Sequence, residues 1–103
     1  MMIGLNKEDL HIITEILKQY PEITEAFIFG SRAKGTQRTS SDVDIAIKGN
    51  GLDELVSKIS GQLNEETPLP YTFDVVVFNP LSNDELQEHI KRVGISFYLK
   101  KIP

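Results

Sequence analysis

The sequence contains no cysteine, which excludes disulfide bonds, thiolate catalysis and cysteine-ligated zinc. Positive charge is also scarce, because 11 Lys and Arg residues stand against 15 Asp and Glu residues and give a formal net charge of −4 at pH 7. Domains that track the phosphates of nucleic acids are usually strongly basic. The charge balance therefore argues against nucleic acid as a partner.

Long apolar runs are missing as well. No stretch approaches the ~20 apolar residues of a membrane span. The first residues, Met1 to Leu5, lack the basic flank and apolar run of a signal peptide. We expect a cytoplasmic protein that does not bind membranes. A length of 103 residues with 40% hydrophobic content predicts a single domain over residues 1–103.

Three segments have the apolar spacing of amphipathic helices. The first follows a cap at Asn6 and runs until Pro21, and the second covers residues 52–63. The third is expected to begin with a capping box between Ser82 and Glu85 and to stop near Gly94, which leaves residues 97–99 as an apolar tail.

Three short apolar runs, residues 26–29, 42–47 and 71–78, are predicted to be strands. The order of elements is α-β-turn-β-α-β-α. This order predicts an α/β fold, a small mixed β-sheet with helices packed on one face and acidic side chains on the other.

A Gly-Ser pair, Gly30 and Ser31, directly follows the first predicted strand. Glycine lacks a Cβ, so a phosphate can come close to the backbone there. If a short helix starts at Ser31, its free N–H groups would point at the anion. Arg32 adjoins this turn, and we expect it to contact a triphosphate.

Two acids, Asp42 and Asp44, open the second predicted strand, with ten residues between Ser31 and Asp42. The period of two in a strand places both carboxylates on one face. A third acid, Asp74, lies on the next strand. Neighbouring carboxylates repel one another unless a cation lies between them, and Mg²⁺ is commonly held by one or two carboxylates together with substrate phosphates.

The combination of Gly30-Ser31, ten residues, Asp42-x-Asp44 and a later Asp74 resembles the signature of the polymerase-β-like nucleotidyltransferase superfamily, and in particular its minimal nucleotidyltransferases. The resemblance runs from about residue 23 to 98. It implies a Mg²⁺-dependent enzyme with two metal ions, for which Mn²⁺ can substitute, and with ATP as substrate. Template-dependent polymerisation is not expected of so acidic a chain.

The resemblance also implies a role for each residue. Asp42 and Asp44 would bridge the metal ions, and Asp74 would bind the catalytic ion and accept a proton. The turn residues Gly30, Ser31 and Arg32 would hold the β- and γ-phosphates.

Two other motifs that bind phosphate or calcium do not match the sequence at required positions. A P-loop would continue Gly35 with Lys and Ser or Thr, but Thr36 and Gln37 follow it. An EF-hand starting at Asp42 would need glycine where Ile47 stands and glutamate where Asp53 stands.

The minimal nucleotidyltransferases are usually antitoxins of HEPN-domain proteins, and the chain has no room for a second domain that would bind an acceptor. We therefore expect the transfer of AMP to a HEPN toxin, in a possible hetero-oligomer. Two alternatives stay open: a non-catalytic antitoxin that acts by occlusion, and an enzyme that modifies a small-molecule hydroxyl.

Overall fold

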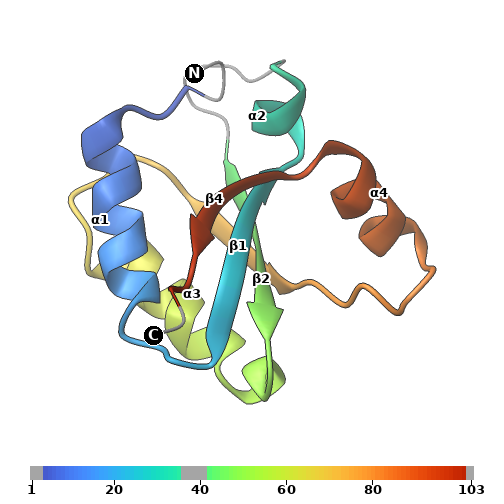
Figure 1. The fold of residues 1–103 in the computed structure, drawn as a ribbon. Coiled ribbons are helices and arrows are strands. Elements are labelled where there is room, and N and C mark those ends of the chain that lie inside the picture. The colour runs from blue at the N-terminus through green and yellow to red at the C-terminus, as the bar shows by residue number, and fades with distance from the viewer. Residues whose placement is uncertain (1–3, 36–41, 102–103) are drawn as a thin grey trace.

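A computed structural model describes residues 4–35 and 42–101 (Figure 1). The elements in chain order are α1 (Lys7–Leu17), β1 (Ile23–Phe29), α2 (Ser31–Lys34), β2 (Val43–Gly49), a single turn of 3₁₀ helix η1 (Leu52–Glu54), α3 (Val56–Glu65), β3 (Phe73–Val77), α4 (Glu85–Val93) and β4 (Ile95–Leu99). None of the helices in these two ranges is long and apolar enough to cross a membrane.

The strands form one mixed sheet in the order β3-β2-β1-β4. Strand β1 is antiparallel to both of its neighbours, and β2 is parallel to β3. The predicted fold class, a small mixed α/β sheet with helices, is confirmed. The parallel pair is important for the site, because β2 and β3 begin at the same edge of the sheet.

Helix α1 begins as its sequence predicts. The Asn6 side chain accepts a hydrogen bond from the backbone N–H of Asp9, and the Asp9 carboxylate accepts one from the N–H of Asn6, which completes a capping box. The helix ends at Leu17, earlier than expected. Tyr20 is nevertheless buried in the core, so its apolar character reflects packing beyond the helix.

The main core lies between one face of the sheet and helices α1 and α3 (Figure 1). A smaller cluster lies on the opposite face, where Ile90 and Val93 of α4 pack against Phe29 and Ala46. The expectation that the helices cover a single face therefore holds for α1 and α3 but is wrong for α4. Because α4 packs beside β1 and β2, it lies on the same face as the acids.

Residues 97–99, expected to be an apolar tail, belong to strand β4. This strand pairs antiparallel with β1, with Tyr98 opposite Ala26 and Ile95 opposite Ile28. The sheet thus gains a fourth strand, and β1 becomes an inner strand. The sequence prediction missed β4 because only Gly94 separates it from α4.

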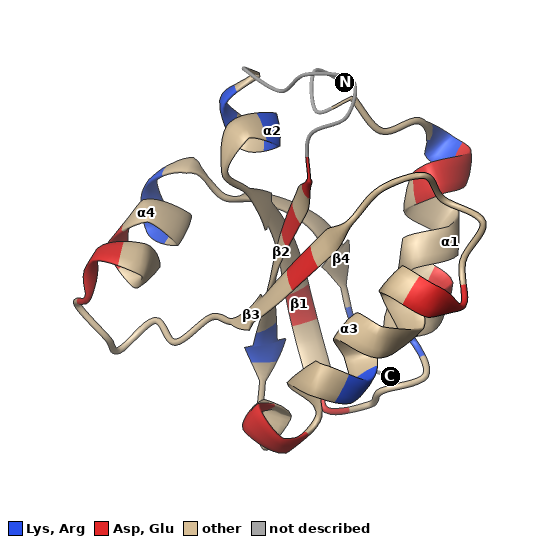
Figure 2. Ribbon diagram, turned by 180° about the vertical axis from the view of Figure 1, so that it is seen from behind, with Lys and Arg blue, Asp and Glu red and all other residues tan. Residues whose placement is uncertain are grey.

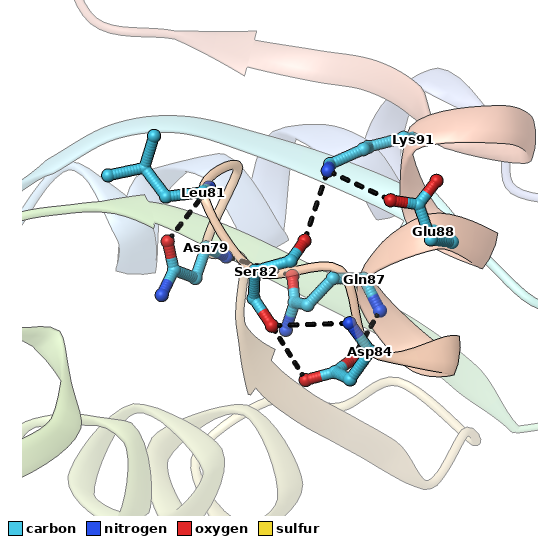
Figure 3. A network of polar contacts seen from close by, with 7 residues as sticks. All are labelled: Asn79, Leu81, Ser82, Asp84, Gln87, Glu88 and Lys91. Atoms are coloured by element: carbon cyan, nitrogen blue, oxygen red, sulfur yellow. Dashed lines mark hydrogen bonds and ion pairs between the residues drawn. The ribbon is translucent and has the colours of Figure 1, made fainter.

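Helix α4 begins differently from its prediction (Figure 3). Its N-cap is Asp84, which accepts a hydrogen bond from the N–H of Gln87 at 2.9 Å. The Ser82 hydroxyl instead bonds to the Asp84 carboxylate at 2.9 Å, and the side chain of Leu81 is 90% exposed. The expected capping box between Ser82 and Glu85 is therefore wrong by two residues.

Candidate active site

The turn after β1 is built on Gly30, which directly precedes α2. Its backbone angles are φ 73° and ψ −148°, a conformation that is open essentially to glycine alone. A Cβ at this position would lie 2.2 Å from the Oδ2 atom of Asp44. The absence of a side chain thus serves both the turn and the close approach of the acid. The short helix α2 starts at Ser31, which meets the condition under which its N–H groups could point at an anion.

Asp44 and Asp74 lie side by side on adjacent parallel strands. Phe29 lies opposite Asp44 on β1, so these three side chains share the face on which α4 packs. Figure 2 shows the acidic segments of β2 and β3 next to each other. Asp42 is exposed and directly precedes β2, so the structure brings the three predicted acids to one end of the sheet.

The electrostatics of Asp44 reflect this arrangement. Partial burial raises the pKa of its carboxyl group, and the negative charges of Asp74 and Asp42 raise the pKa further, while Arg32 lowers it. Because the three acids repel one another, a cation bound between them would offset the repulsion.

The donor set suits a hard divalent cation, because it consists of carboxylates and stands beside the glycine turn. The side chains do not converge in this conformation, since no three His, Cys, Asp or Glu side chains in residues 4–35 and 42–101 are grouped so as to hold a metal ion. The carboxylate chemistry and the strand register, which sets Asp44 beside Asp74, are the features that suit such a cation.

Arg32 lies beneath the site. Its side chain is 2% exposed, and its Nε atom donates a hydrogen bond to the backbone carbonyl of Asp42 at 3.3 Å. The centre of its guanidinium group lies 4.8 Å from the centroid of the Tyr71 ring. Tyr71 was not expected from the sequence to be near the site, because it begins a predicted strand and no pattern distinguishes it.

Helix α4 contributes His89 to the same face. The imidazole lies edge-on to the ring of Phe29, with ring centroids 6.1 Å apart. Burial lowers the pKa of His89, and the positive charges of Lys34 and Arg92 lower it further. The sequence offered one signal for this residue, its place next to the buried Ile90 on an amphipathic helix.

A cleft of about 590 Å³ lies elsewhere, at the opposite end of β2 and β3, and it is lined by residues that include Lys48, Asp53 and Gln87. None of the predicted site residues lines it. The acids therefore stand at an open edge of the sheet rather than in this cleft.

Comparison with known proteins gives the family. Residues 11–102 match the family described as polymerase beta nucleotidyltransferase. A relative from Haemophilus influenzae, named as the probable protein adenylyltransferase MntA, is 32% identical over 94 residues, which cover 90% of this chain and 82% of the relative.

Solved structures with the same fold include a toxin–antitoxin with AMP-PNP, at a TM-score of 0.73 and 23% identity over 90% of this chain and 75% of the other. A mutant of the toxin–antitoxin MntA–HpeT has a TM-score of 0.72 and 22% identity over 94% of this chain and 76% of the other. At such identities the structural matches establish the fold alone. The family match and the curated relative establish that the chain belongs to the polymerase beta nucleotidyltransferase family and is a nucleotidyltransferase.

Proposed function

We propose that this protein transfers AMP from ATP to a hydroxyl group of a partner protein, a HEPN-domain toxin that is neutralised by the transfer. The observation that carries the proposal is the contact between the glycine turn and the acids, since a Cβ on Gly30 would collide with Asp44. The phosphate-binding part and the acidic part of one site thus adjoin. The relative named as a probable protein adenylyltransferase supports a protein as the acceptor.

In this proposal the backbone at Gly30 and Ser31 holds the triphosphate. Asp42, Asp44 and Asp74 hold two divalent ions, Mg²⁺ with Mn²⁺ as a substitute. Such ions, when bound, offset charge on the phosphates and acidify the acceptor hydroxyl.

At the α-phosphorus, the transfer forms one bond and breaks one. The acceptor oxygen bonds to the α-phosphorus of ATP, and the bond from that phosphorus to the oxygen bridging to the β-phosphate breaks. Pyrophosphate leaves with the electron pair of that bond. The proton of the acceptor hydroxyl passes to the carboxylate of Asp74, which is exposed and open to a second molecule.

A macromolecular acceptor is favoured by the position of the acids. Asp42 and Asp74 are both exposed, so the hydroxyl of a folded partner could reach them without entering a deep pocket. A stable complex with the partner would supply the orientation that a small acceptor obtains from an enclosed site.

The test is a mass measurement on the partner. After incubation with ATP and Mg²⁺, we expect the toxin to gain about 329 Da for each AMP, the mass added when adenylyl transfer releases pyrophosphate. Asp74→Asn should abolish this gain, since loss of a general base alone typically lowers rates by ~10²–10⁴-fold. Asp53→Asn, the same change at an exposed acid of η1, is the matched control and should leave the gain intact.

Two results would contradict the proposal. If neither wild type nor Asp74→Asn adds mass, yet both neutralise the toxin equally in cells, the protein acts by occlusion. If AMP appears on a small-molecule hydroxyl while the toxin stays unmodified, the acceptor class is wrong.

A further inference from the structure

Arg32 is a buried cation next to the acidic site. A charge taken out of water is unfavourable unless nearby groups compensate for it. The contacts of Arg32 include the Asp42 carbonyl, 3.3 Å from its Nε atom, and the face of Tyr71. A guanidinium group suits these contacts, because it donates from a planar fork and stacks on aromatic rings.

The ring of Tyr71 is itself held from two sides. Its hydroxyl donates a hydrogen bond to the Asp9 carboxylate at 3.3 Å, at the start of α1. Its ring meets the buried ring of Phe73 edge-on, with centroids 6.3 Å apart. Phe73 pairs with Val43, the first residue of β2, so the surface on which Arg32 rests is tied to the strand that follows Asp42.

Asp42 lies just before the paired part of β2. Pairing between β2 and β3 begins at Val43, whose N–H donates to the carbonyl of Thr72 at 2.9 Å. Asp42 precedes this pairing, and its side chain is exposed. The hydrogen bond from Arg32 therefore reaches a backbone group just outside the paired residues of β2 and β3.

We propose that Arg32 is a positioning residue, which holds the Asp42 carbonyl so that its carboxylate faces the metal site, and that Tyr71 supports Arg32 from below. The inference rests on the proposed function, because it assumes that the acids bind divalent metal. It differs from the expectation that Arg32 contacts the triphosphate, because a side chain that is 2% exposed offers almost no surface to a ligand.

The test is the affinity for Mn²⁺ alone, measured without nucleotide by the paramagnetic signal of the free ion. Removing a group that orients a metal ligand typically weakens metal binding by ~10–100-fold. We expect a loss in that range for Arg32→Lys, because lysine keeps the charge but not the planar fork. Arg92→Lys, the same change at an exposed arginine of α4, is the matched control and should bind Mn²⁺ like wild type.

A second pair of variants covers the case in which Arg32→Lys does not fold. Tyr71→Phe keeps an aromatic face for the guanidinium group, and Tyr71→Leu removes it. We expect weaker Mn²⁺ binding for Tyr71→Leu than for Tyr71→Phe, with both proteins shown to be folded by urea titration. Equal binding by the two would overturn the role of Tyr71 as the support.

The failure of this inference is distinguishable from failure of the proposed function. If wild type and Asp44→Asn bind Mn²⁺ equally poorly, the metal site itself is wrong. If wild type binds Mn²⁺ and folded Arg32→Lys binds it equally well, the positioning role is overturned. A loss of ATP affinity in that variant, with AMP affinity unchanged, would then make Arg32 a phosphate contact.

Discussion

Gly30 and Gly35 flank α2 with nearly the same φ, 73° and 74°, but their surroundings differ. A Cβ on Gly30 would lie 2.2 Å from Asp44, whereas a Cβ on Gly35 meets no heavy atom within 4 Å among the described residues. Both glycines relieve backbone strain, and Gly30 alone of the two gives space to an acid.

This difference predicts that Gly30→Ala affects turnover much more than folding. An alanine held in a backbone conformation with positive φ costs roughly 1–3 kcal/mol of stability, so both variants should lose some stability. Displacement of Asp44 by about 1 Å should in addition lower turnover by about 10²-fold. Gly35→Ala, which places alanine in a left-handed αL backbone (φ 74°, ψ 18°) without the collision, is the control for both urea stability and turnover. Equal losses of turnover in the two variants would show that the turn is merely structural.

The raised pKa of Asp44 predicts a stability effect. A carboxyl group whose pKa is raised by folding destabilises the folded state once it is ionised, so this contribution grows as pH rises through the folded pKa and vanishes below the unfolded value of 3.8. In the absence of metal, Asp44→Asn should therefore be more stable than wild type at pH 7. Urea titrations at about pH 7 and about pH 3 test this, since the difference should disappear at the lower pH. A variant that is less stable than wild type at pH 7 would contradict the cause assigned here.

Individual acids of the site were predictable because their spacing sets their face. The period of two puts Asp42 and Asp44 on one face of their strand, and the parallel register of β2 and β3, which the sequence did not reveal, sets Asp74 beside Asp44. The burial of Arg32 was not predictable, because it depends on Tyr71, a residue from a distant part of the chain.

At the scale of elements, α4 shows how the fold selects one of two possible helix starts. Ser82 with Glu85 and Asp84 with Gln87 have the same spacing for a capping box. The helix uses Asp84 because Gln87 is buried, accepts a hydrogen bond from the N–H of Asn79 at 2.8 Å and donates one to the carbonyl of Val77 at 3.1 Å. Figure 3 shows Gln87 together with Asp84 and Asn79. Contacts with the end of β3 thus set where α4 starts. A local sequence pattern cannot predict such contacts.

The cap assignment predicts unequal effects of two truncations. Asp84→Ala removes the acceptor for the N–H of Gln87, whereas Ser82→Ala removes only a group that bonds to Asp84. At pH 7, Asp84→Ala should lower the urea midpoint more than Ser82→Ala. Hydrogen bonds lower the pKa of Asp84, so the effect of Asp84→Ala should shrink as pH falls below 3.8. A larger loss for Ser82→Ala would restore the cap predicted from sequence.

For the whole molecule, the sequence predicted the order of elements up to α4 and the class of fold. It did not predict that α4 covers the acidic face, because the apolar stripe of Ile90 and Val93 fits either side of a sheet. It also did not reveal β4, because five residues after a helix have too little periodicity to be recognised. Both depend on pairing and packing across the molecule.

The late position of β4 has a consequence for synthesis. Ser96 of β4 bonds to Glu25 of β1 across 71 positions of the chain. At about 5–20 residues per second, a ribosome would release the partners roughly 4–14 s apart. During that interval β1, which leads into the glycine turn, has one open edge that can recruit other nascent chains. Until β4 is made and covers this edge, the sheet is open to pairing with a second chain there.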